Sequence, residues 1–132
     1  MDRLQTRPQF QAALAGRTLA RTAHFALHCC PLAGTAATVQ PDSAPPLFPR
    51  DGVWLGAMVP KRWAKRAVTR NAIKRQIYTV STEIETTLAP QAHVVRLRAT
   101  FDRAQYISAS SDLLKRAVRA ELQQLFARAV AP

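Results

Sequence analysis

The sequence holds little cysteine and no long apolar stretch, and each shortage excludes a class of protein. Its two cysteines, Cys29 and Cys30, are adjacent, and adjacent residues rarely close a disulfide because an extended strand points their side chains apart. We therefore expect reduced thiols. No apolar run approaches the roughly 18 residues of a membrane span, and the N-terminal residues MDRLQTRPQF have no apolar centre typical of a signal peptide. These absences predict a cytoplasmic protein without membrane contact.

Acidic residues are also scarce. Eight Asp and Glu stand against 19 Lys and Arg, which gives a formal net charge of +11 and indicates a polyanionic partner. No carboxylate pair and no Ser/His/Asp or Cys/His/Asn order is visible that would hydrolyse a phosphodiester unaided. We predict no catalytic side chain and no metal held by the protein. The length of 132 residues, 48% of them hydrophobic, predicts one domain, 1–132, with its own core.

More than half of the positive excess lies in one short segment. Residues 61–75 carry seven cations and no acid, whereas an ordinary soluble surface mixes charges of both signs. This pattern favours a nucleic-acid site over a merely solvated face. A basic helix lying on a membrane is disfavoured because the segment lacks a broad Trp, Phe or Leu face.

Hydrophobic periodicity outlines the fold. Residues 8–15 have the pattern of a short helix, and residues 22–30, 53–59 and 93–99 have the pattern of strands. Residues 31–51 contain five of the nine prolines and predict a flexible loop between neighbouring strands. The order is helix, strands, helix, strand, helix. It predicts an α/β (α+β) fold of two layers, in which helices pack on a small mixed sheet.

Two longer helices follow from apolar residues at helical spacing. The first is predicted to begin near Ala67 and to bury the stripe Ile73, Ile77, Val80, Ile84 and Leu88. Its opposite, outward side carries Asn71, Lys74, Arg75 and Tyr78. The second is capped by Ser110 or Ser111 and buries Leu114, Val118, Leu122, Leu125 and Ala129.

Several side chains have more than one interpretation. Asn71 is a helix cap if the helix starts later, and the aliphatic stem of Arg70 can cover the edge of the core. Alternation along residues 22–30 puts His24, His28 and Cys30 on one face. That face is either structural, part of a ligand cleft, or a transition-metal site of imidazole and thiolate groups.

The basic segment closely resembles that of the protein subunits of bacterial ribonuclease P. The motif of that family is an Arg-Asn pair followed by Lys-Arg, here Arg70, Asn71, Lys74 and Arg75. The resemblance is specific because the motif follows a strand and a basic loop and lies at the start of a helix. It extends over the N-terminal helix, the strand with His28 and the last helix, which is nearly the whole chain except residues 31–51.

The resemblance implies a fold and a function. The fold would contain a left-handed strand-helix-strand crossover, against the usual right-handed rule. The family protein is the accessory subunit of an endoribonuclease that frees the mature 5′ end of tRNA, and the RNA subunit performs the chemistry with Mg²⁺ that it mainly binds itself. The implied partners are ribonuclease P RNA, with one protein for each catalytic RNA, and precursor tRNA.

Residue roles follow from the charge pattern and the resemblance together. Contact with the catalytic RNA is expected from Lys61, Arg62, Lys65, Arg66, Arg70, Asn71, Lys74 and Arg75. A cleft for the single-stranded 5′ leader is expected from Phe10, Leu14 and His28. The chain departs from the family at Ala72 and Tyr78, where basic residues are often found, and at Leu14 and His28, where aromatic residues are common.

Two other functions remain open from the sequence. A non-catalytic RNA-binding protein of another ribonucleoprotein, such as the ribosome, would share the charge and the small α/β build. A self-sufficient nuclease would need metal ions held on clustered acids, and the scattered acids argue against it.

Overall fold

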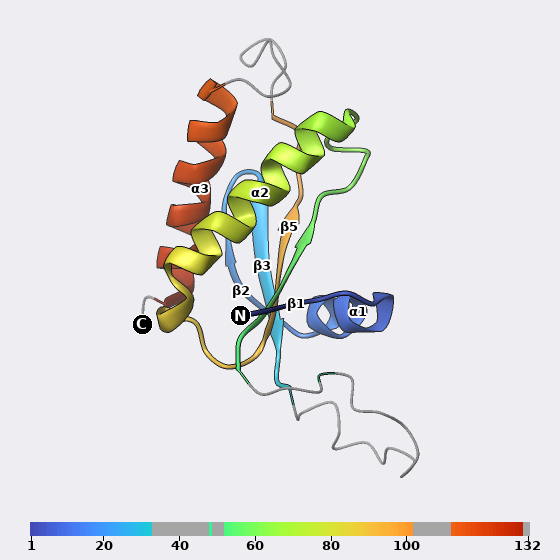
Figure 1. Ribbon diagram of the computed structural model, residues 1–132, viewed down its shortest axis with the longest axis vertical. Coiled ribbons are helices and arrows are strands. Elements are labelled where there is room, and N and C mark those ends of the chain that lie inside the picture. Colours follow the sequence, from blue (N-terminus) through green and yellow to red (C-terminus); the bar gives the residue numbers. More distant parts are fainter. Residues whose placement is uncertain (33–47, 49–51, 102–111, 131–132) are drawn as a thin grey trace.

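The computed structural model describes residues 1–32, 48, 52–101 and 112–130 (Figure 1). The elements are β1 (Asp2–Arg3), α1 (Arg7–Ala15), β2 (Arg17–Arg21), β3 (Phe25–Cys30), β4 (Trp54–Met58), α2 (Ala67–Glu83), a short 3₁₀ helix (Glu85–Thr87), β5 (Ala92–Leu97) and α3 (Asp112–Val130). Most of the predicted loop 31–51 and both predicted caps, Ser110 and Ser111, lie outside the described residues. No helix within the described ranges is long and apolar enough to cross a membrane.

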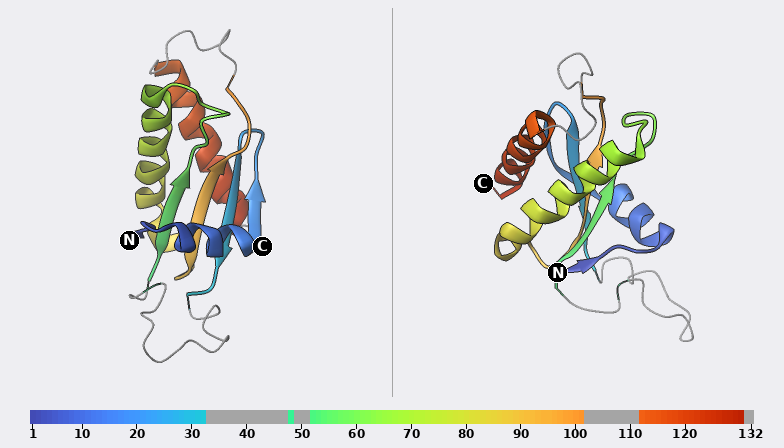
Figure 2. Two further views of the ribbon diagram at one scale, coloured as in Figure 1. Left: turned by 90° about the vertical axis from the view of Figure 1, so that its right-hand side faces the viewer. Right: turned by 45° about the horizontal axis from the view of Figure 1, so that its top comes forward.

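The strands form one mixed sheet in the order β1-β4-β5-β3-β2. β4 runs parallel to both β1 and β5, whereas β3 runs antiparallel to β5 and β2. The helices α2 and α3 pack on one face of this sheet, and α1 lies on the other (Figure 2). The predicted α+β fold, with helices packed on a small mixed sheet, is confirmed.

The parallel strands β4 and β5 are joined through α2. In Figure 1 both strands run upward, α2 crosses in front of the sheet, and β5 lies to the left of β4. The crossover is therefore left-handed, as the resemblance implied and against the usual rule. β5 also lies between β3 and β4. The prediction that residues 31–51 link neighbouring strands is wrong, because a strand later in the sequence enters between the two.

The first long helix begins where the sequence predicts, and both long helices bury predicted apolar residues. α2 starts at Ala67 and buries Ile73, Ile77 and Val80, and α3 buries Leu114, Val118, Leu122 and Leu125. α2 ends at Glu83, however, and does not continue to Leu88. The hydroxyls of Ser81 and Thr82 donate to carbonyls one turn back, and such bonds in a run of poor helix formers weaken the helix at that point.

The core has one cluster on each face of the sheet. Between the sheet, α2 and α3 lie large side chains that are almost fully buried, among them Phe25, Leu55, Ile77, Leu97 and Leu122. Under α1 lies a smaller cluster made of Leu4, Ala13, Cys30, Phe48, Trp54, Ala92 and Val94. Both cysteines are free and buried.

Candidate nucleic-acid interface

The loop of residues 60–66 leads from β4 into α2 and exposes four cations, Lys61, Arg62, Lys65 and Arg66. The carbonyl of Pro60 accepts hydrogen bonds from the backbone N–H groups of Trp63 and Ala64, each at 3.1 Å. Ala64 is only 6% exposed and belongs to the core, and Trp63 packs against that core. Because buried residues fix this basic loop from within, its charges remain at the surface.

Arg70 fastens the basic loop to the first turns of α2. Its Nη1 donates to the carbonyls of Ala64 at 3.0 Å and Lys65 at 2.9 Å. The sequence suggested that Arg70 contacts RNA or covers the edge of the core. Neither interpretation includes these two hydrogen bonds, because they depend on the path of the loop. In the structure Arg70 therefore holds the carbonyls of Ala64 and Lys65 against the start of α2.

The motif residues Asn71, Lys74 and Arg75 are exposed on the outward side of α2. Because the helix begins at Ala67, Asn71 lies inside it, and the interpretation of Asn71 as a cap is wrong. The residue at the cap position is Arg66, whose side chain makes no capping bond, and the first turn holds no acid. Free N–H groups and the helix dipole add positive potential there.

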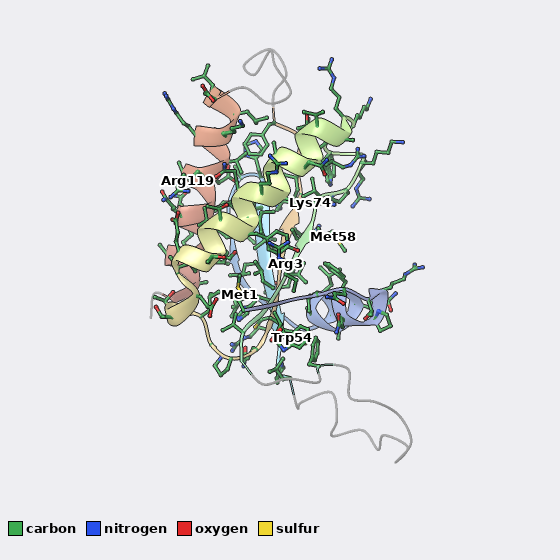
Figure 3. The ribbon with its side chains drawn as sticks, viewed as in Figure 1. Met1, Arg3, Trp54, Met58, Lys74 and Arg119 are labelled. Atoms are coloured by element: carbon green, nitrogen blue, oxygen red, sulfur yellow. The ribbon has the colours of Figure 1, made fainter. Side chains whose placement is uncertain are left out.

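The sequence did not reveal that β1 contributes to this surface. Arg3 lies beside the outward side of α2, with its guanidinium over the ring of Tyr78 (Figure 3). A strand of two residues gives no periodicity that could have predicted this contact.

On the opposite face of the sheet, α1 holds the side chains predicted to form a leader cleft. Phe10 and Leu14 are half-buried and pack against the smaller core cluster, as does Met58 of β4. A Cβ at Gly56 would lie 2.6 Å from the Phe10 ring, so only glycine at this position lets the ring approach the sheet so closely.

His28 shares this face but is only 6% exposed. Its Nδ1 lies 3.1 Å from the hydroxyl of Thr18, and Arg96 donates through Nε to its Nε2 at 3.3 Å. Burial, followed by the charges of Arg96 and Arg21, lowers the pKa of His28. The buried imidazole therefore offers little stacking surface. Half-buried Arg96 adds a cation to this face that the sequence analysis did not include among the cleft residues. Alternation along β5 could have indicated it, because Arg96 lies on the same face as Val94.

His24 does not belong to this face, and the interpretation that groups it with His28 and Cys30 is wrong. β3 begins at Phe25, so His24 lies in the preceding turn. Its Nδ1 is 2.7 Å from a carboxylate oxygen of Glu121 on α3, and its ring stacks on Phe101 at 3.9 Å. Across the described residues, no group of three His, Cys, Asp or Glu side chains could hold a metal ion.

Known proteins resemble the chain along almost its whole length. A sequence model described as Ribonuclease P matches residues 1–129. The Ribonuclease P protein component of Bordetella petrii is 38% identical over 126 residues, which cover 96% of this chain and 89% of that protein. Its namesake in Ralstonia pickettii is 32% identical over 130 residues, covering 98% and 80%.

A solved structure shares the fold. The RNase P protein of Staphylococcus aureus superposes with a TM-score of 0.66 at 18% identity, covering 96% of this chain and 94% of that one. Nothing in these comparisons supports the ribosomal alternative.

Proposed function

The chain belongs to the ribonuclease P protein family, and we propose that its basic loop and α2 bind the catalytic RNA of that endoribonuclease. In the holoenzyme it is the accessory protein component. One observation carries the proposal: an acid-free segment with seven cations is anchored on buried residues, and three of its own residues, Asn71, Lys74 and Arg75, are exposed on the outward side of α2. The whole chain then acts as one RNA-binding domain in the cytoplasm, with one protein on each catalytic RNA.

The side chains on α2 suit a phosphodiester backbone. The guanidinium of Arg75 presents a planar fork that matches two phosphate oxygens, and the ammonium of Lys74 adds a point charge. The amide of Asn71 can donate to a phosphate or a ribose hydroxyl. Folded RNA exposes these groups, whereas its deep major groove hides the base edges from side chains.

The face under α1 suits the single-stranded leader of precursor tRNA. Single strands are held by stacking surfaces beside positive charge, and here half-buried Phe10 and Leu14 share the face with Arg96. His28 acts in this cleft through Arg96, whose Nε bonds to it. It is therefore a positioning residue for the cation.

Magnesium belongs to the RNA in this proposal. The carboxylate of Glu121 bonds to Thr22 and His24, and both oxygens of Glu83 bond to Arg119. These groups do not fit a metal site, so no step of hydrolysis is assigned to the protein. Its cations instead offset the repulsion between two RNAs and so reduce the need for counterions.

Cleavage of precursor tRNA over a magnesium titration tests this function. The catalytic RNA with the protein should process its substrate at lower magnesium than the RNA alone, and the purified, RNA-free protein should show no turnover. Arg116→Ala, which removes an exposed cation from α3, is the matched control and should behave like the parent chain. RNA-free protein that cleaves, and loses this activity when one of its own carboxylates is changed, contradicts the proposal.

A further inference from the structure

The short strand β1 fixes the direction of Arg3. The backbone N–H groups of Asp2 and Leu4 donate to the carbonyls of Val53 at 3.0 Å and Leu55 at 2.9 Å. Leu4 is 5% exposed and belongs to the core cluster under α1. Successive side chains of a strand point to opposite faces. With Leu4 buried toward α1, Arg3 must point to the side of α2.

Arg3 rests there on an aromatic ring. Its guanidinium carbon lies 4.0 Å from the centre of the Tyr78 ring, which is the geometry of a cation–π contact. Arg3 is exposed, and in the described part of the chain no carboxylate pairs with it. The ring covers one face of the guanidinium, while the N–H donors at its edge are available to a ligand.

This pair lines an open groove along α2 with a volume of about 670 Å³. Asn71, Lys74 and Arg75 also line it. The one carboxylate among the described lining residues is Glu83, whose two oxygens accept bonds from Nη2 of Arg119 at 2.6 and 2.8 Å. Because Arg119 neutralises this acid, the uncompensated charges that face the groove are all positive.

We propose that the groove is a phosphate subsite for the catalytic RNA, in which Arg3 binds the phosphate and Tyr78 holds Arg3 in place. The subsite rests on the proposed function of α2 and adds a ligand from β1. Guanidinium groups bind phosphate oxygens in pairs. Because the ring beneath Arg3 restricts its side chain before binding, less conformational freedom is lost when the phosphate arrives.

Arg3→Ala tests the phosphate contact in the holoenzyme assembled from the full chain and ribonuclease P RNA. The affinity is measured over a salt titration. The slope of log K against log salt is negative, and loss of one contact should make it shallower by about 0.7 to 0.9. Binding should also weaken at every salt concentration. Arg116→Ala removes an equal charge from α3, outside the groove, and should leave the slope close to that of the parent chain.

Tyr78→Leu tests the positioning role without changing the charge. It should weaken binding about twofold to fivefold, the worth of an exposed cation–π pair. In the Arg3→Ala background it should have no further effect, because the side chain that it positions is gone. If Tyr78→Leu weakens binding equally in the parent chain and in the Arg3→Ala variant, Tyr78 does not act through Arg3. That result would indicate a general packing role and remove Tyr78 from the proposal.

The outcomes separate this subsite from the proposed function. If Arg3→Ala melts like the parent chain and binds with unchanged slope and affinity, the subsite is overturned. If Arg75→Ala still lowers the affinity in that case, RNA binding by α2 stands. If neither change matters, both proposals fail.

Discussion

Arg96 and His28 are joined by a hydrogen bond that settles which nitrogen of the imidazole carries the proton. Nε of Arg96 lies 3.3 Å from Nε2 of His28, and because a guanidinium only donates, Nε2 must accept. The proton therefore lies on Nδ1, which donates to the hydroxyl of Thr18 at 3.1 Å. A doubly protonated ring would lose the bond to Arg96 and place two cations in contact.

This arrangement predicts that acid destabilises the protein. Burial lowers the pKa of both His28 and His93 from the ordinary value of 6.5, so the unfolded chain takes up protons first as the pH falls. Stability should be full above about pH 6.5 and decline as the pH falls toward the depressed folded values. Urea unfolding of His28→Gln, whose amide can still accept from Arg96, should show a shallower decline. Identical pH profiles for the variant and the parent would contradict this.

The Asn71→Ala and Arg75→Ala variants should differ in the salt dependence of their RNA binding. Arg75→Ala removes a charged phosphate contact and should make the negative slope of log K against log salt shallower by about 0.7 to 0.9. Asn71→Ala removes a neutral donor and should weaken binding with little change in slope. Both variants are compared by salt titration of holoenzyme assembly, with Arg116→Ala as the control. Equal slopes for Arg75→Ala and the parent chain count against phosphate binding by α2.

Arg70→Ala should loosen the basic loop. Two bonds from a charged donor to the carbonyls of Ala64 and Lys65 disappear, which we expect to cost about 1 to 3 kcal/mol of the free energy of unfolding. Hydrogen exchange should accelerate at the amides of Trp63 and Ala64, because the loop loses its tie to α2. Unchanged exchange at these two amides would show that the loop holds its shape without Arg70.

Gly56→Ala should destabilise the protein through the ring of Phe10. The added Cβ would lie 2.6 Å from that ring and 2.8 Å from Leu4, and overpacking of this kind costs about 1 to 3 kcal/mol. In a Phe10→Leu background the cost should be smaller, because the ring is absent. Urea unfolding of the two single variants and the double variant measures this coupling, and strict additivity would refute it.

The leader of precursor tRNA should contact the face under α1. Photoreactive nucleotides placed in the leader should crosslink to residues between 10 and 28, where Phe10, Leu14 and His28 lie. Phe10→Leu should reduce this crosslinking more than it reduces holoenzyme assembly. Crosslinks that reach the basic loop but never this segment would overturn the assignment.

The sequence predicts the parts of the fold that depend on local repetition. α2 and α3 were found because Ile73, Ile77 and Val80, and likewise Leu114 and Val118, recur at helical spacing. β2 was missed because its residues RTLAR are arginine-rich and half exposed and show no clean alternation. Two residues, the whole of β1, are too few for any pattern.

Contacts between distant segments could not be predicted. Arg3 reaches Tyr78, and Arg96 reaches His28, only because of which strands pair. His24 was misplaced for a similar reason, since its bond to Glu121 crosses from the turn before β3 to α3. The motif on α2, in contrast, needed only its own helix to bring Asn71, Lys74 and Arg75 to one side.

β4 fixes the distance between the face under α1 and the basic loop. Gly56, in its middle, underlies Phe10, and its end leads directly into the basic loop at Pro60. A strand advances about 3.3 Å per residue and hardly stretches, so four residues span at most about 13 Å between the two surfaces. One residue inserted in β4 would turn the strand residues that follow it to the opposite face of the sheet. The spacing between the face under α1 and the basic loop is thus a property of covalent geometry.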